Sequence, residues 1–124
     1  MSVEGATLYL SGNREPILRQ IRFALEPGEA LGIIGPSAAG KTTLARMLVG
    51  SIAPTAGSVR LDGAEINVWD SSDRGRHVGY LPQDVELFSG TIKSNIARFS
   101  EAPDEAIVRA AQLAGAHDMI LEMP

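Results

Sequence analysis

The stretch Gly35–Thr43, which reads GPSAAGKTT, constrains the fold of this chain more than any other feature. Residues 35–42 match the pattern G-x-x-x-x-G-K-[S/T] in full. A chain of this length meets that pattern by chance roughly once in two hundred tries. The pattern needs a strand before it and a helix after it. An apolar run over 30–34 precedes the loop, and apolar residues recur at helical spacing over 44–48. The sequence therefore predicts a strand–loop–helix unit that binds phosphate.

The residue types in this loop suit phosphate and magnesium. Backbone N–H groups of a glycine-rich turn and of a helix N-terminus together form a concave positive site for phosphate oxygens. We expect Lys41 to reach the β- and γ-phosphates as a point charge and the Thr42 hydroxyl to coordinate Mg²⁺, a hard cation that prefers oxygen. The predicted nucleotide-binding residues of the loop are Gly35, Pro36, Ser37, Ala38, Ala39, Gly40, Lys41, Thr42 and Thr43. The alternative, a glycine-rich turn with a solvated lysine, leaves the glycine spacing unexplained.

The composition narrows the classes of protein that can carry this loop. With 124 residues, 44% of them hydrophobic and 21% charged, the chain has the length and composition of one soluble globular domain. Its net charge of −4 and its scattered basic residues argue against a nucleic-acid partner. The absence of cysteine excludes a disulfide scaffold and a thiolate metal site. No apolar run approaches the roughly 20 residues of a membrane-spanning helix.

Strands and helices are expected to alternate along the chain. The predicted strands cover residues 3–10, 17–25, 30–34 and 78–81, and a hairpin with an Asp62-Gly63 turn covers 57–66. Predicted helices follow the glycine loop, lie within 70–77 and begin at Pro103. The continuous apolar run at 30–34 is typical of a strand in a sheet that is covered on both faces. This order predicts an α/β fold with an added antiparallel hairpin.

Motifs outside the glycine loop distinguish between the protein families that use such a loop. The guanine-reading motif Asn-Lys-x-Asp is absent, which argues against a GTPase. VGYLPQD at 78–84 places a glutamine after a predicted strand, and ELFSGTIKSNI follows at 86–96. From about Ile17 onwards the chain resembles the nucleotide-binding domain of an ABC transporter, most of all the ATPases of type I secretion exporters of the protease and haemolysin class. The resemblance implies an ABC-type P-loop NTPase core with an antiparallel β hairpin subdomain.

The resemblance also implies roles for residues outside the loop. Gln83 corresponds to the Q-loop glutamine, whose amide would contact Mg²⁺ and the attacking water. The predicted catalytic residues are therefore Lys41 and Gln83. The predicted metal ligands are Thr42 and Gln83. The family stacks adenine on an aromatic residue near the first strand. Tyr9 is the available aromatic, although counting back from Lys41 gives Leu10 at that place, and a tyrosine that packs on the sheet is the alternative.

The same resemblance predicts partners. ATP and Mg²⁺ would bind at the loop, the transmembrane domain of an exporter would dock after Gln83, and a second nucleotide-binding domain would complete a dimer. The chain would then work at the cytoplasmic face of the inner membrane. Leu87, Phe88 and Ile92 would form either the docking surface for the membrane domain or a local mini-core, and both interpretations stay open at this point.

The chain departs from the family pattern in two respects. Many relatives carry a third glycine where this chain has Ala38, which therefore needs a compatible φ angle. Residues 1–124 also lack the LSGGQ signature, the strand that ends in Asp-Glu and the switch histidine, so we expect a partial, truncated nucleotide-binding domain. The predicted function is ATP binding within an exporter ATPase. The alternative is a catalytically incompetent fragment or an interaction module, and a small kinase is a third class without visible acceptor-binding residues.

Overall fold

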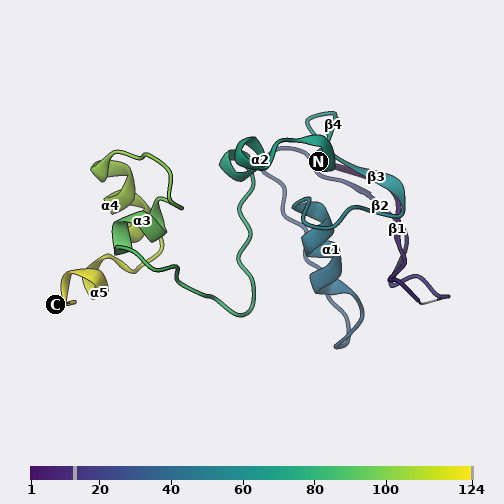
Figure 1. The fold of residues 1–124 in the computed structure, drawn as a ribbon, viewed down its shortest axis with the longest axis horizontal. Coiled ribbons are helices and arrows are strands. Elements are labelled where there is room, and N and C mark those ends of the chain that lie inside the picture. Colours follow the sequence, from purple (N-terminus) through teal and green to yellow (C-terminus); the bar gives the residue numbers. More distant parts are fainter. Residues whose placement is uncertain (13, 124) are drawn as a thin grey trace. The chain divides into compact units, whose positions relative to one another are not determined.

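The chain divides into two compact units, Met1–Tyr80 and Leu81–Pro124. The computed structural model describes residues 1–12 and 14–123 (Figure 1). Positions 13 and 124, which fall within the predicted domain, lie outside the described residues. The relative placement of the two units is not determined.

The first unit is built on a four-stranded sheet in the order β2-β1-β3-β4, in which every neighbouring pair is antiparallel. The strands are β1 (Ser2–Leu8), β2 (Leu18–Ala24), β3 (Ala56–Leu61) and β4 (Ala64–Glu65). The strands predicted over 3–10 and 17–25 and the hairpin over 57–66 are therefore confirmed. Asp62 and Gly63 have φ angles of 50° and 82° between β3 and β4. Two positive φ angles in a row are what a type I′ hairpin turn requires.

Bulges interrupt the pairing of β1 on both of its sides. Against β3, Glu4 pairs with Ser58 but Thr7 pairs with Ala56, so β1 holds one extra residue at this point. The same extra residue appears against β2, where the partners change from Val3–Phe23 to Ala6–Ile21. An extra residue in one strand changes which face its later side chains point to. A strict two-residue alternation therefore fails along β1.

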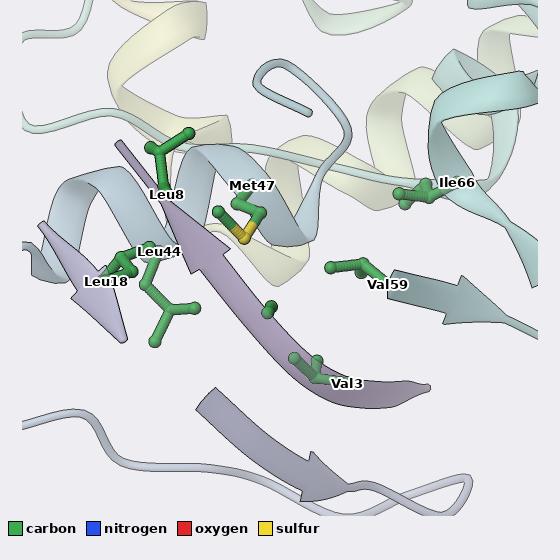
Figure 2. Close-up of a cluster of buried hydrophobic side chains, with 8 residues drawn as sticks. Val3, Leu8, Leu18, Leu44, Met47, Val59 and Ile66 are labelled. Carbon is green, nitrogen blue, oxygen red and sulfur yellow. The ribbon is translucent and has the colours of Figure 1, made fainter. Parts of the chain in front are cut away.

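The helix α1 (Lys41–Leu48) packs against this sheet (Figure 2). Its Leu44 and Met47 are buried, and Met47 is fully shielded from solvent. The cluster that surrounds them comprises Val3, Ala6, Leu8, Leu18, Val59 and Ile66. Complete burial of a side chain such as Met47 contributes about 1.5–3 kcal/mol. The helix that was predicted from the spacing after the glycine loop is confirmed, and it ties the loop to the sheet.

Two predicted strands are wrong. Residues 30–34 and 78–81 carry no strand, and Ile34 is 96% exposed. An isolated extended segment gains no ladder hydrogen bonds, and a parallel strand needs neighbours on its edges to be stable. In the part of the chain that the structure describes, no strand pairs with either segment. The parallel layer expected for the α/β core is therefore not formed by these residues, and the sheet that is present is antiparallel.

The first unit ends in two short helical elements, η1 (Ile66–Val68) and α2 (Ser71–His77). The helix predicted within 70–77 is confirmed as α2, and Asp70 is its N-cap. Its carboxylate accepts a hydrogen bond of 2.8 Å from the backbone N–H of Ser72. The hydroxyl and the backbone N–H of Ser72 both stabilise the charged carboxylate, which lowers the pKa of Asp70 below its ordinary value.

The second unit contains three helices, α3 (Ile92–Ile96), α4 (Asp104–Leu113) and α5 (His117–Leu121). Pro103 is the N-cap of α4 and not its first helical residue. The helix α3 is not among the predicted helices, and an ion pair between Lys93 and Asp104 joins it to α4. Across residues 1–12 and 14–123, every helix is too short or too polar to cross a bilayer.

Candidate phosphate-binding site

The glycine loop ends where α1 begins, and Gly40 is the N-cap of the helix with a φ of 88°. A side chain at this position would be strained by the backbone angle alone. It would also be crowded, because a Cβ on Gly40 would lie 3.1 Å from Cδ2 of Leu18 and 3.3 Å from the carbonyl oxygen of Ile17. The end of the loop thus rests directly on the start of β2, and only glycine fits this close approach.

Lys41 folds back over the loop. Its Nζ donates hydrogen bonds of 2.8 Å to the carbonyl oxygen of Gly35 and of 2.7 Å to that of Pro36. These bonds join the first residues of the loop to the first residue of the helix. The ammonium group is held beside the loop backbone, where the phosphate chemistry predicted from the sequence requires a cation.

The N-terminus of α1 offers unpaired N–H groups to an anion. The first helical hydrogen bond runs from the N–H of Leu44 to the carbonyl of Gly40, at 2.8 Å. Within this first turn, which is fully described, no side chain caps the helix and no residue is acidic. The helix dipole and the N–H groups of Lys41, Thr42 and Thr43 therefore favour a negatively charged ligand. The exposed Thr42 adds an oxygen ligand of the kind that Mg²⁺ prefers.

Ala38 adopts the left-handed conformation, with a φ of 64°. This is the alanine that stands where many relatives have glycine, and its φ is the one that glycine adopts without strain. An L-residue in this region costs about 1–2 kcal/mol. Alternation of right- and left-handed residues turns successive N–H groups to one side and forms an anion-binding concavity. The strain at Ala38 thus accompanies the conformation that would hold phosphate.

We expect Ala38→Gly to stabilise the first unit by about 1 kcal/mol, because the substitution removes the strain of the left-handed angle from the folded protein. ATP affinity should stay close to that of wild type, since the free protein already holds this angle. Urea unfolding and calorimetric titration with ATP measure the two quantities. Ala39→Gly is the matched control, since Ala39 has no positive φ and should gain no stability. Equal stabilisation by both substitutions would show that the angle at position 38 is not responsible.

Tyr9 and Gln83 are not brought into this site by the described contacts. Tyr9 lies just beyond β1 with 45% of its side chain exposed, so it does not belong to the buried core. Its backbone N–H donates to the Thr55 hydroxyl at 3.1 Å. Gln83 is exposed and belongs to the second unit. Adenine stacking by Tyr9 and metal contact by Gln83 remain predictions.

The residues proposed as a docking surface line a hollow of about 670 Å³ within the second unit. Leu87 is 81% exposed and Phe88 is 71% exposed, which contradicts a local mini-core. Sequence reasoning found Leu87, Phe88 and Ile92 but missed the other apolar residues of the hollow, which are Ile96, Phe99, Met119, Ile120 and Met123. The TIKSNI segment carried a signal for this arrangement, because a threonine before a helical turn is a preferred N-cap.

A glycine loop closed by Lys41 at the start of a helix defines a protein of the phosphate-loop class. The profile of the ABC transporter family matches residues 18–123, and the chain belongs to this family. Over its whole length it is 50% identical to the type I secretion system ATP-binding protein PrsD of Rhizobium meliloti (strain 1021) and 34% identical to the colicin V secretion/processing ATP-binding protein CvaB of Escherichia coli. Over 86% of its length it is 39% identical to the ATP-binding cassette sub-family B member 6 of Rattus norvegicus.

The family resemblance inferred from the glycine loop and the glutamine motif is therefore confirmed, including its likeness to the secretion class. The chain spans 22%, 18% and 13% of the lengths of these three relatives, respectively.

Proposed function

We propose that this chain is the ATP-binding part of an ABC exporter of the type I secretion class. The observation that carries the proposal is the loop itself, in which the Lys41 ammonium lies on the carbonyls of Gly35 and Pro36 at the uncapped start of α1. Membership of the ABC transporter family and similarity to two secretion ATP-binding proteins support ATP as the ligand of the loop and export as its use. The alternative of an interaction module without nucleotide leaves this geometry without a role.

Different residues would contact the phosphates, the Mg²⁺ ion and the adenine of ATP. Backbone N–H groups of residues 35–43 would surround the phosphates, and Lys41 would exchange its carbonyl partners for the β- and γ-phosphate oxygens. The hydroxyl of Thr42 and the amide oxygen of Gln83 are the groups that would hold Mg²⁺. A bound Mg²⁺ would neutralise charge on the phosphates. Tyr9 would stack on adenine.

The partners follow from membership of a transporter family. The chain would dock a transmembrane domain on the hollow that contains Leu87, Phe88 and Ile92, because exposed apolar residues gathered in one hollow are typical of a protein–protein surface. A second nucleotide-binding domain would complete the assembly. The chain would lie at the cytoplasmic face of the inner membrane, where a secretion exporter binds ATP.

Thr42→Val tests the nucleotide site through its metal dependence. We expect wild-type protein to bind ATP about tenfold more tightly with Mg²⁺ than with EDTA, and the valine variant to lose this difference while it retains weak ATP binding. Calorimetric titration in both buffers gives the four dissociation constants. Thr42→Ser keeps the hydroxyl and should behave as wild type. Failure of the wild-type chain to bind ATP in either buffer would refute the proposed function.

A further inference from the structure

Phe88 holds an ordered position in the hollow of the second unit although most of its ring is exposed. The ring meets that of Phe99 edge to face, with the centroids 5.9 Å apart and the planes at 87°. Such a pair is worth about 0.5–1.5 kcal/mol beyond the area that it buries. The segment that carries Phe88 has no helix or strand of its own. Its position therefore has to be set by side chains.

Asn95 on α3 supplies that support. Its Oδ1 accepts a hydrogen bond of 2.9 Å from the N–H of Phe88, and its Nδ2 donates one of 2.9 Å to the carbonyl oxygen of Phe88. The same amide donates to the carbonyl of Thr91 at 3.0 Å. A side-chain amide thus pairs with both backbone polar groups of Phe88, as a neighbouring strand would. The bonds fix the backbone of Phe88 to the helix that it faces.

The other half of the aromatic pair is fixed by a strained turn at the end of the same helix. Arg98 and Phe99 have φ angles of 54° and 58°. Each left-handed residue of this kind costs about 1–2 kcal/mol and is found where the surrounding structure over-determines it. The N–H of Phe99 donates to the carbonyl of Ser94 at 2.8 Å, and the ring lies 3.4 Å from where a Cβ on Gly90 would stand. The helix α3 therefore positions both rings.

We propose that Asn95 is a positioning residue that pre-organises the Phe88–Phe99 pair for contact with the exporter's membrane domain. The inference rests on the docking surface proposed above and adds the residue that sets its affinity. An exposed aromatic ring that is already fixed loses less conformational freedom when a partner binds. Without the amide of Asn95, Phe88 would have to be ordered by the partner at the moment of binding. The partner would then bind more weakly, although its contacts were unchanged.

Fluorine NMR of the full chain tests the positioning directly. The chain has three phenylalanines, Phe23, Phe88 and Phe99, so 4-fluorophenylalanine gives three signals. We expect Asn95→Ala to move the Phe88 and Phe99 signals toward the random-coil shift, because the ring-current effect of the edge-to-face pair is lost. Phe23 belongs to the first unit and should not move. Unchanged Phe88 and Phe99 signals would overturn the proposal.

Binding to the exporter's membrane domain in lipid nanodiscs is the second readout. We expect Asn95→Ala to weaken binding to the membrane domain about tenfold. Asn95→Asp should weaken it less, because the carboxylate still accepts a hydrogen bond from the N–H of Phe88. Both variants should bind ATP with wild-type affinity. Should the alanine variant fail to fold, the aspartate variant carries the comparison. Gln112→Ala, which removes an exposed amide from α4, is the matched control.

Phe88→Ala separates the two proposals. If it abolishes binding while Asn95→Ala and Asn95→Asp bind as wild type, the docking surface stands and the role of Asn95 is refuted. If Phe88→Ala binds as wild type, the docking surface of the proposed function is itself wrong, and the inference about Asn95 falls with it. Weaker binding by both substitutions, together with the shifted fluorine signals, supports both.

Discussion

Lys41→Ala should weaken ATP binding about a hundredfold or more, because truncation of one member of a hydrogen-bonded charge pair costs about 2–5 kcal/mol. The positive charge is lost from the place where the β- and γ-phosphates would bind. The two bonds from Nζ to the carbonyls of Gly35 and Pro36 are lost as well. Because Lys41 would give up these bonds when the nucleotide binds, the lower affinity comes from the missing contact with phosphate. Calorimetric titration with ATP and Mg²⁺ measures the change.

Two substitutions control this experiment. The chain has one other lysine, Lys93, which pairs with Asp104 in the second unit, and Lys93→Ala removes the same charge from a place without phosphate chemistry. Its ATP affinity should equal that of wild type. Lys41→Arg keeps the charge but replaces the compact ammonium with a planar guanidinium, and we expect it to bind with intermediate affinity. Tight binding by Lys41→Ala would show that the loop is not the nucleotide site.

The sequence predicted the parts of the fold whose causes are local. The turn at 26–29 has Pro27 and Gly28 at its centre, a residue pair typical of a type II turn, with Gly28 at a φ of 86° and a hydrogen bond from the N–H of Glu29 to the carbonyl of Glu26. The hairpin turn at Asp62-Gly63, the cap at Asp70 and the helix after the glycine loop are of the same kind. In each case a few neighbouring residues decide the backbone angles, so a short pattern is sufficient.

The errors concern features that depend on distant partners. The run at 30–34 reads as a buried strand, but burial needs strands on its edges, and none in the described residues supplies them. The bulges in the pairing of β1 with β2 are likewise not predictable from the sequence, because they depend on which strands pair. Gln20, a non-glycine residue with a φ of 52°, lies where β2 gains one residue, which restores the register that Gly5 had shifted. Because such bulges change which face the later side chains of a strand reach, a count of residues back from Lys41 does not decide between Tyr9 and Leu10.

The candidate site also has parts that depend on neighbouring residues and parts that depend on distant ones. The loop from Gly35 to Thr43 could be predicted because the chemistry of phosphate dictates a contiguous pattern. The support beneath Gly40 could not, since it comes from Ile17 and Leu18, more than twenty residues earlier in the chain. The amide of Asn95 is closer in sequence to Phe88, yet its two bonds exist only once α3 has formed. Short polar residues such as asparagine can make so many local bonds that sequence alone does not select one.

Gly57→Ala should destabilise the first unit by about 3 kcal/mol, the largest loss of stability that we expect from a single added methyl group in the chain. Gly57 has a φ of 81° and lies in β3 opposite the bulge of β1. A Cβ at this position would meet the carbonyl oxygen of Gly5 and lie 2.5 Å from that of Glu4. Both obstacles are backbone atoms, so no side chain can move aside. The bulge would have to open, and the β1–β3 ladder with it.

Gly63→Ala isolates the steric part of this loss. Gly63 has nearly the same φ, 82°, but a Cβ there would meet nothing within 4 Å. We expect this variant to lose only the cost of the backbone angle, about 1 kcal/mol. Trp69, the single tryptophan, belongs to the first unit, so its fluorescence during urea unfolding reports on that unit. Equal losses in the two variants would mean that β1 and β3 can separate at little cost. The bulge at Gly5 would then be a flexible junction and not the rigid base on which α1 and the glycine loop are held.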